Sequence, residues 1–294
     1  MRDFRFGIEI ETVGQTREVV ARAIQTVVGG TVSGFDTWEV RDAHGRVWKA
    51  MPDGSLTDSY RSAEVVSPIL HYGDLETLQS VVRAIRKAGA KVDASCGIHI
   101  HVDASRFDAK GLVNLAKLVH QQEDLIVHAL AIQARRLDRY TKLLPTGFID
   151  AIERTKPKTR EELQRLWYGG EARPSRYNST RYHGLNLNSV WYRGTIEFRW
   201  SEGTLHAGQV KAYVQFVLAL AAKALGAKAA AGRKRRLTLE SGRYDMRVLL
   251  LRLGMIGDEF KTARLHLLSK LSGSAAWKHG RRDSLTGEAP HSEG

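Results

Sequence analysis

Three short stretches of the chain alternate ionisable side chains with apolar ones: residues 4–11, 96–103 and 195–200. Successive side chains of a β-strand point to opposite faces, so each stretch predicts one apolar face and one ionisable face. Glu9 and Glu11 share the ionisable face of the first stretch, about 7 Å apart by the strand rise. Two carboxylates on a strand packed against a core are costly without a positive partner, which is either a basic side chain or a metal ion.

The second stretch places His99 and His101 opposite its apolar residues, and the third places Glu197 and Arg199 there. Taken singly, these patterns are more often structural: a solvated acidic edge, a surface histidine pair and a cross-strand ion pair. Taken together, they favour one cleft lined by carboxylates and imidazoles. Hard oxygen ligands with one imidazole suit Mg²⁺ or Mn²⁺ better than structural zinc, and the oxygen donors would be Glu9, Glu11, Glu64 and Glu197. An arginine beside such a cluster suits an anionic phosphate or carboxylate, which it holds in a fork.

The remaining elements predict an α+β protein whose antiparallel sheet carries helices on its apolar face. Apolar periodicity and capping residues predict helices over 16–28, 75–88, 108–136, 207–225, 244–253 and 258–271, with a short one ending near Trp167. Further strands are expected at 37–40, 47–49, 63–69 and 184–191, the last forming a hairpin with 194–200. Residues 137–180 are expected to be less regular, with a mobile loop over 169–178. The tail 273–294 is expected to be disordered.

The composition is ordinary for a soluble globular protein, with 43% hydrophobic and 26% charged residues. No apolar run reaches the roughly 18 residues that a membrane span needs. The first residues lead into a charged strand rather than a signal peptide. The lone Cys96 excludes an internal disulfide and a multi-cysteine zinc site. These features predict a cytoplasmic protein with no membrane partner.

The net charge of +13 is concentrated toward the end of the chain. Residues 223–294 hold 15 Lys and Arg against 7 Asp and Glu, and four of the basic residues form the run 233–236. Such a run is usually a solvated loop or helix end. The alternative interpretation is a surface for an acidic or nucleic-acid partner.

Five motifs, in this order along the chain, resemble the amidoligases of the carboxylate–amine ligase superfamily, which includes glutamine synthetase and glutamate–cysteine ligase. The motifs are residues 6–11 (FGIEIE), 53–56 (DGSL), 64–69 (EVVSPI), 96–103 (CGIHIHVD) and 195–200 (TIEFRW). The resemblance implies a catalytic domain over 1–225, built on a glutamine-synthetase-like curved antiparallel sheet with helices packed on its convex face. ATP and divalent metals would lie in the concavity. Residues 226–272 would form a basic loop and C-terminal helices outside the matched region.

The resemblance also implies roles for individual residues. Glu9 and Glu11 would ligate metals, Glu64 would join one metal site, and His99 and Glu197 would join the other. His101 would lie near the nucleotide phosphates, and Arg199 would contact the transferring phosphoryl group. Arg181 and Asn186 correspond to substrate or phosphate contacts. Glutamine synthetase has another glutamate shortly after the one that Glu64 matches, and this chain has no clear counterpart, so the count of two or more ions stays open.

The function that the resemblance implies is an ATP- and Mg²⁺-dependent ligase joining a carboxylate to an amine, with a glutamyl or peptide carboxylate as one candidate substrate. Transfer of the γ-phosphoryl group to the carboxylate gives an acyl phosphate, which the amine then attacks. Such a transfer needs positioning and charge neutralisation rather than a protein nucleophile. The chain has no Gly-x-x-x-x-Gly-Lys loop, so phosphate binding falls to the metal cluster. Asp53 is the candidate general base for the amine.

Three alternatives stay open at this point. A metal-dependent hydrolase would use the pair His99 and His101 with activated water instead of ATP. A thiol enzyme would use Cys96 as its nucleophile, although a small buried cysteine at a strand start is the commoner case. A non-catalytic nucleic-acid-binding protein would rest on the basic C-terminal part, and it leaves the acidic cleft unexplained.

Overall fold

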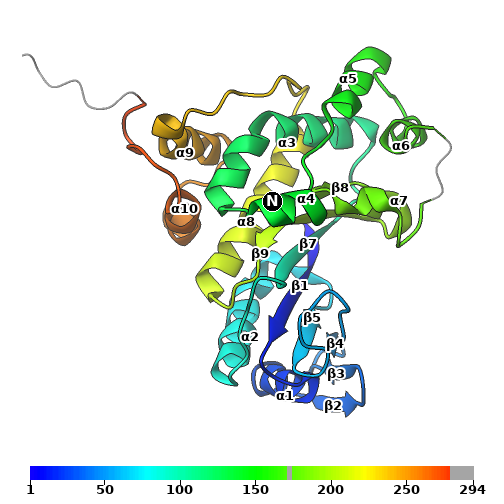
Figure 1. Cartoon of the computed structure of the whole chain (residues 1–294), viewed down its shortest axis with the longest axis vertical. Helices are drawn as coiled ribbons and strands as arrows, with labels where there is room; N and C mark the ends of the chain where they lie inside the picture. The colour runs from blue at the N-terminus through cyan, green and yellow to red at the C-terminus, as the bar shows by residue number, and fades with distance from the viewer. Residues whose placement is uncertain (171–173, 279–294) are drawn as a thin grey trace, which may run out of the picture.

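One sheet of nine strands organises the molecule (Figure 1), in a computed structural model that describes residues 1–170 and 174–278. The strand order is β2-β3-β4-β5-β1-β7-β9-β8, with β6 paired to the start of β1. The strands are β1 (Arg5–Val13), β2 (Thr31–Gly34), β3 (Trp38–Arg41), β4 (Val47–Met51), β5 (Ser62–Val66), β6 (Leu70–His71), β7 (Gly97–Asp103), β8 (Leu185–Asn186) and β9 (Thr195–Glu202). Every pairing between these strands is antiparallel, as expected for an α+β layer. The expected antiparallel α+β sheet is confirmed, but the sheet is open and not strongly curled, so the curved form that the resemblance implied is not seen.

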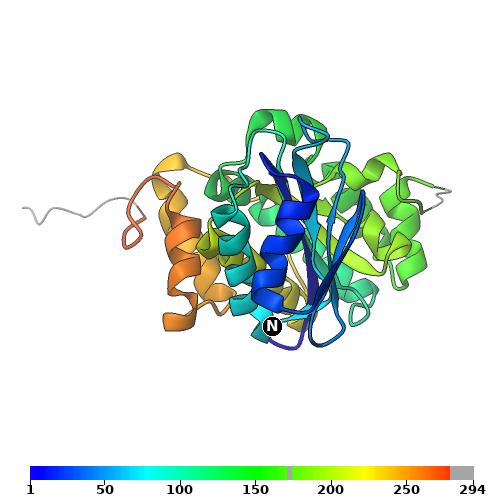
Figure 2. The same ribbon diagram turned by 90° about the horizontal axis from the view of Figure 1, so that it is seen from below.

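The helices of the described residues are α1 (Arg17–Val28), α2 (Leu75–Lys87), α3 (Ala109–Leu130), α4 (Ala134–Arg139), α5 (Thr146–Thr155), α6 (Arg160–Tyr168), α7 (Asn188–Tyr192), α8 (Ala207–Gly226), α9 (Gly242–Arg252) and α10 (Lys261–Leu268). Helices α1, α3 and α8 pack directly on this sheet. Helix α1 packs on β3 and β4, α8 packs on β7, and α2 lies between these two helices (Figure 2). Phe6, Ile8 and Ile10 of β1 point into this layer and are no more than 2% exposed. Burial of that face turns Glu9 and Glu11 to the opposite one.

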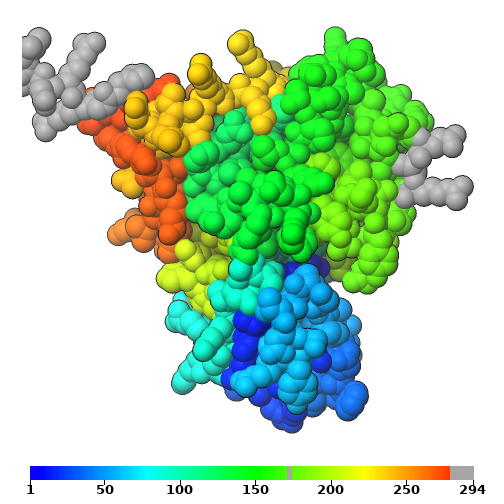
Figure 3. All heavy atoms as spheres, in the orientation of Figure 1, coloured from blue at the N-terminus to red at the C-terminus, as the bar shows by residue number. Residues whose placement is uncertain are grey.

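The first strands and the segment with helices α5 to α7 lie toward opposite ends of the long axis of the molecule. Figure 3 shows the blue and cyan N-terminal residues at one end and the green segment that contains α5 to α7 at the other. The central strands β1, β7 and β9 join the two ends. Side chains from distant parts of the chain therefore meet on the face of these three strands.

The helix expected over 108–136 is broken in two. Helix α3 ends at Leu130 because Ala131 adopts a left-handed conformation with φ 53°, and its N–H caps the helix on the Val127 and His128 carbonyls. The chain restarts as α4 at Ala134. An alanine is no signal for a left-handed cap, so the apolar pattern alone predicted one helix that was too long.

We expected a hairpin between 184–191 and 194–200, and the prediction of its first strand is wrong. Only Leu185 and Asn186 pair with β9, opposite Phe198 and Glu197, and the chain then turns into α7. The side chain of Asn188 explains the turn, because it accepts a hydrogen bond from the Tyr168 hydroxyl and donates one to the Ser175 carbonyl. These partners come from the preceding segment, which the local pattern does not show.

Residues 137–180 are more regular than expected. Helix α5 buries Phe148, Ile149 and Ile152, and α6 buries Leu163 and Trp167. The expected N-terminal cap of the second helix is confirmed, since Thr159 accepts a hydrogen bond from the Glu162 N–H. Of the expected mobile loop, residues 171–173 lie outside the described residues, as do residues 279–294 of the expected disordered tail.

Glu123 on α3 is a fully buried carboxyl away from the acidic face. Burial raises its pKa from 4.5 to about 8, although the Leu144 N–H and Lys234 oppose the shift. The folded protein therefore keeps a proton that the unfolded chain loses above about pH 4.5, so this group makes the free energy of unfolding fall from pH 4.5 to about 8.

We expect Glu123→Gln to remove this contribution to the pH dependence of the free energy of unfolding. Its Tm should rise relative to wild type as the pH increases from 4.5 to 8, and the difference should stay constant above that. Thermal unfolding at pH 4.5, 6, 7 and 8.5 measures it, with exposed Glu161→Gln as the matched control. A difference in Tm that does not change with pH contradicts the assignment.

Candidate functional site

The register of the central strands places the ionisable residues in adjacent rows across the sheet. Glu11 of β1 lies opposite Glu64 of β5, and Glu9 lies opposite His99 of β7. In the next row His101 lies opposite Glu197, which in turn lies opposite Asn186 of β8. The structure therefore brings together all five residues that the resemblance named as metal ligands, and it places His101 and Asn186 beside them.

Glu9 is at the centre of this arrangement. One of its oxygens, Oε2, lies 3.3 Å from His99 Nδ1, and the other, Oε1, lies 3.3 Å from His101 Nε2. His101 Nε2 is also 3.9 Å from Glu197 Oε1. Burial raises the pKa of Glu9, but the two imidazoles outweigh it and hold the pKa well below its ordinary value. Burial lowers the pKa of His101, and Glu9 and Glu197 more than offset that effect.

Asp53 joins the other end of the row, next to Glu11 and Glu64. One oxygen from each of these three carboxyl groups lies within 4.8 Å of the others. Burial, followed by the negative charges of Glu9, Asp53 and Glu11, raises the pKa of Glu64 to about 9. The Gly97 N–H donates a 2.5 Å hydrogen bond to Glu11, which fixes the orientation of that carboxylate. Without a cation, these three carboxyl groups repel one another.

Glu197 is held by two neighbours. Arg199 Nη1 donates to its Oε1 at 2.5 Å, and Asn186 Nδ2 donates to its Oε2 at 2.6 Å. Arg199 also reaches the Tyr140 carbonyl, at 3.5 Å. Burial would raise the pKa of Glu197, but His101 and Arg199 lower it, so the carboxylate stays charged. Asn186 and Arg199 therefore act on the cluster through Glu197.

The donor set fits divalent cations. Three overlapping groups each offer ligand atoms within 4.8 Å of one another: Glu9 with His101 and Glu197, Glu9 with His99 and Glu64, and Glu11 with Asp53 and Glu64. Each group combines carboxylate oxygens with at most one imidazole, which suits Mg²⁺ or Mn²⁺. His101 Nε2 is buried and has no hydrogen-bond partner within the described residues, although it faces two carboxylates. A nitrogen in that situation is ready to take a metal ion as its partner.

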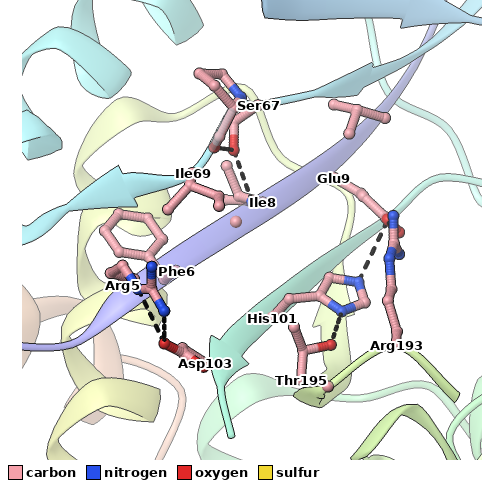
Figure 4. Close-up of a pocket in the computed structure, with 14 residues that line it drawn as sticks. Arg5, Phe6, Ile8, Glu9, Ser67, Ile69, His101, Asp103, Arg193 and Thr195 are labelled. Atoms are coloured by element: carbon pink, nitrogen blue, oxygen red, sulfur yellow. Dashed lines mark hydrogen bonds and ion pairs between the residues drawn. The ribbon is translucent and has the colours of Figure 1, made fainter. Parts of the chain in front are cut away.

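A pocket of about 300 Å³ opens beside this cluster, at the Arg5 end of β1 (Figure 4). Glu9 and His101 form its inner end, and the apolar side chain of Ile69 lines its wall. His101 is positioned there by Thr195, whose hydroxyl lies 3.0 Å from Nδ1 and 2.8 Å from the Ser189 hydroxyl. The pocket therefore joins an open space to the buried carboxylates.

The structure does not bring every predicted residue into the cluster. Arg181 stacks on the rings of Tyr177 and Tyr182 and donates to the Arg176 carbonyl. Asp53 does lie at the cluster, among carboxylates that could hold a metal ion, and its role as the general base stays a prediction.

Sequence reasoning missed two arginines, Arg136 and Arg193. Arg136 of α4 is buried against Gly97, where an added Cβ would lie 2.5 Å from its Nη2. Arg193 makes an ion pair with Glu9. Arg136 lies on the short helix α4 and Arg193 follows α7, so neither stands on a strand whose alternation could have marked it. Only Arg193 lies close in sequence to a strand with an acidic face.

Cys96 is buried and its thiol has a pKa raised to about 11, chiefly by burial. A nucleophilic cysteine needs a lowered pKa, so this thiol is in the wrong environment for covalent catalysis. We expect Cys96→Ala to keep at least about half of the wild-type turnover, because it removes one small buried atom and no charge. Turnover of the purified variant measures this, and a complete loss in a folded variant would restore the thiol mechanism.

The comparison with protein families agrees with this geometry. A family model described as "Putative amidoligase enzyme" matches residues 2–221. The chain belongs to this amidoligase family. The match contains all of the strands described above and ends in α8, before α9 and α10. A search of curated proteins found no match. Membership in the family identifies the chain as a ligase of the carboxylate–amine type, and within the described residues no helix is long and apolar enough to cross a membrane.

Proposed function

We propose that this amidoligase joins a carboxylate to an amine with ATP and Mg²⁺, through an acyl-phosphate intermediate. The observation that carries the proposal is the run of three overlapping ligand groups on one buried face, with Glu9 and Glu64 each shared by two of them. Shared carboxylates favour neighbouring ions, and neighbouring ions are the arrangement that phosphoryl transfer uses to neutralise phosphate oxygens.

The residue roles follow from this arrangement. Glu9, Glu11, Glu64, His99 and Glu197 are the proposed ligands, as the resemblance implies, and Asp53 completes the group at Glu11. Mg²⁺ or Mn²⁺ held there would supply charge neutralisation for the polyphosphate. Arg199 supports Glu197 and would contact the phosphoryl group as it transfers. Asn186 keeps Glu197 oriented, and Arg181 remains a candidate for a substrate contact outside the cluster.

In the proposed reaction, a carboxylate oxygen of the substrate attacks the γ-phosphorus of ATP, and the bond to the β–γ bridging oxygen breaks to release ADP. The amine then attacks the acyl carbon, and inorganic phosphate leaves with the oxygen that came from the carboxylate. The amine loses a proton in this step, and Asp53 is the candidate base that accepts it. A protein nucleophile is not required, because binding, orientation and charge neutralisation carry the reaction.

The pocket of Figure 4 is the proposed place of the nucleotide. His101 lies at its inner end, so the phosphates would point toward the buried carboxylates and the base toward Ile69. We propose residues 1–225 as the catalytic domain, on the glutamine-synthetase-like plan that the resemblance implies. Residues 226–272 pack against it through α9 and α10, which contact α3 and α8.

The basic run gives little support to the nucleic-acid alternative. Lys234 lies 3.2 Å from Asp124 and 3.9 Å from Glu123, so the middle of the run is used to hold the loop on α3. Its use as a binding surface for an acidic partner stays a prediction. The acidic face favours the ligase because carboxylates repel a nucleic-acid backbone.

Release of ADP tests the proposal. The purified protein is incubated with ATP, Mg²⁺ and a panel of carboxylates and amines, and both ADP and amide are measured. The proposal requires that ADP and amide appear in equal amounts and only when metal and both substrates are present. Product formed at the same rate without ATP supports the metal-dependent hydrolase instead.

A further inference from the structure

Arg193 lines the pocket and its side chain points toward Glu9 (Figure 4). Its Nη1 lies 3.1 Å from Glu9 Oε1 and donates a hydrogen bond to it. The arginine side chain is 52% exposed, while that of Glu9 is only 12% exposed. A surface arginine therefore supplies a positive charge to a carboxylate that is otherwise enclosed.

The guanidinium contacts an oxygen of a carboxylate that is a candidate metal ligand. Glu9 Oε1 is the oxygen that also faces His101 Nε2, and Glu9 belongs to two of the three ligand groups. A divalent cation bound by Glu9 would lie a few ångströms from the guanidinium, and like charges at that separation repel strongly in a partly buried site. Metal binding at Glu9 and the Arg193–Glu9 pair therefore oppose each other.

The local structure lets the arginine side chain leave without moving the backbone. The Arg193 N–H caps α7 on the Ser189 carbonyl, which holds the main chain in place. The side chain is half exposed and borders the same pocket that we assign to the nucleotide. Its planar fork matches a phosphate as well as a carboxylate.

We propose that Arg193 is an exchangeable cation of the active site. It neutralises Glu9 while no metal ion is bound, and it transfers to the polyphosphate of the nucleotide when a divalent ion takes its place on Glu9. The inference rests on the proposed function for its second half, the phosphate contact. Its first half, competition with the metal ion, depends only on the ion pair itself.

Arg193→Ala is expected to change two binding constants in opposite directions. Without nucleotide, Mn²⁺ should bind about three to ten times more tightly than to wild type, because a competing ion pair is gone. With Mn²⁺ saturating, the non-hydrolysable nucleotide AMP-PNP should bind about tenfold more weakly, because a phosphate contact is lost. Isothermal titration calorimetry measures both constants without any turnover.

Arg5→Ala is the matched control. Arg5 lines the same pocket and its side chain is 51% exposed, but its partner is Asp103 rather than Glu9. Removing this charge should tighten Mn²⁺ binding by less than about twofold, since screening weakens its effect on Glu9. The remote Arg83→Ala on α2 should leave both binding constants unchanged.

The proposal is overturned if Arg193→Ala binds Mn²⁺ no more tightly than Arg5→Ala does. It is equally overturned if the variant binds AMP-PNP as tightly as wild type does. Wild-type protein that binds Mn²⁺ but no nucleotide would contradict the ligase function and the phosphate contact together. In that case the Mn²⁺ comparison still decides whether Arg193 competes with the metal ion.

Discussion

Glu9→Gln is expected to lower ATP-dependent amide formation by about a thousandfold, the scale of losing a charge-stabilising group at a phosphoryl-transfer centre. Glu9 is shared by two ligand groups, so the neutral amide weakens two metal positions with one substitution. The amide has nearly the same shape as the carboxylate, so the fold should survive. Initial rates of ADP release at saturating Mg²⁺ measure the effect.

Glu39→Gln is the control for this substitution. Glu39 lies on β3 and pairs with Lys49 on the exposed part of the sheet, so its loss should change the rate by less than about twofold. The prediction is contradicted if folded, metal-bound Glu9→Gln retains more than about a tenth of wild-type activity. Glu9 would then not be a central metal ligand in the reaction.

Glu64→Gln is expected to make the metal-free protein more stable and the metal-bound protein less stable than wild type. Burial and the neighbouring charges raise the pKa of Glu64 to about 9 in the folded protein, against 4.5 as its ordinary value. Because the folded pKa is the higher one, this group lowers the free energy of unfolding as the pH rises from 4.5 to about 9. At pH 7 and without metal, the substitution should therefore add about 1–3 kcal/mol to the free energy of unfolding.

Adding metal should make wild type more stable than Glu64→Gln. A bound ion stabilises the folded state by about 2.7 kcal/mol when its concentration is a hundred times the Kd. The variant gains less, because Glu64 is a member of two of the three ligand groups and both lose it. Thermal unfolding with EDTA and then with 10 mM Mn²⁺ measures both stabilities. Equal increases in Tm for wild type and Glu64→Gln on adding Mn²⁺ would show that Glu64 binds no ion.

The sequence predicted the central strands well because their pattern is local. Alternation of apolar and ionisable residues at 4–11, 96–103 and 195–200 follows directly from the period of a strand, and one face had to be buried. The errors lie where non-local contacts decide the backbone. Ala131 ends a helix without the usual glycine, and Asn188 turns the chain into α7 through partners at Tyr168 and Ser175.

The site was predictable only in part for the same reason. Glu9, His99 and Glu197 stand on strands, so their shared face could be inferred before their contacts were known. The grouping of Asp53 with Glu11 and Glu64 could not, because Asp53 begins the turn after β4, and the position of that turn depends on the packing of β4 and β5. Arg193 was visible only as part of a turn, and its partner is 184 residues away.

Transfer of oxygen is the most direct test of the proposed chemistry. A substrate carboxylate labelled with ¹⁸O is converted in the presence of ATP and Mg²⁺, and the phosphate released is analysed by mass spectrometry. An acyl phosphate requires one ¹⁸O atom per turnover to appear in inorganic phosphate, while the other stays in the amide. Phosphate that contains no ¹⁸O, in a reaction that still forms the amide, would contradict the account.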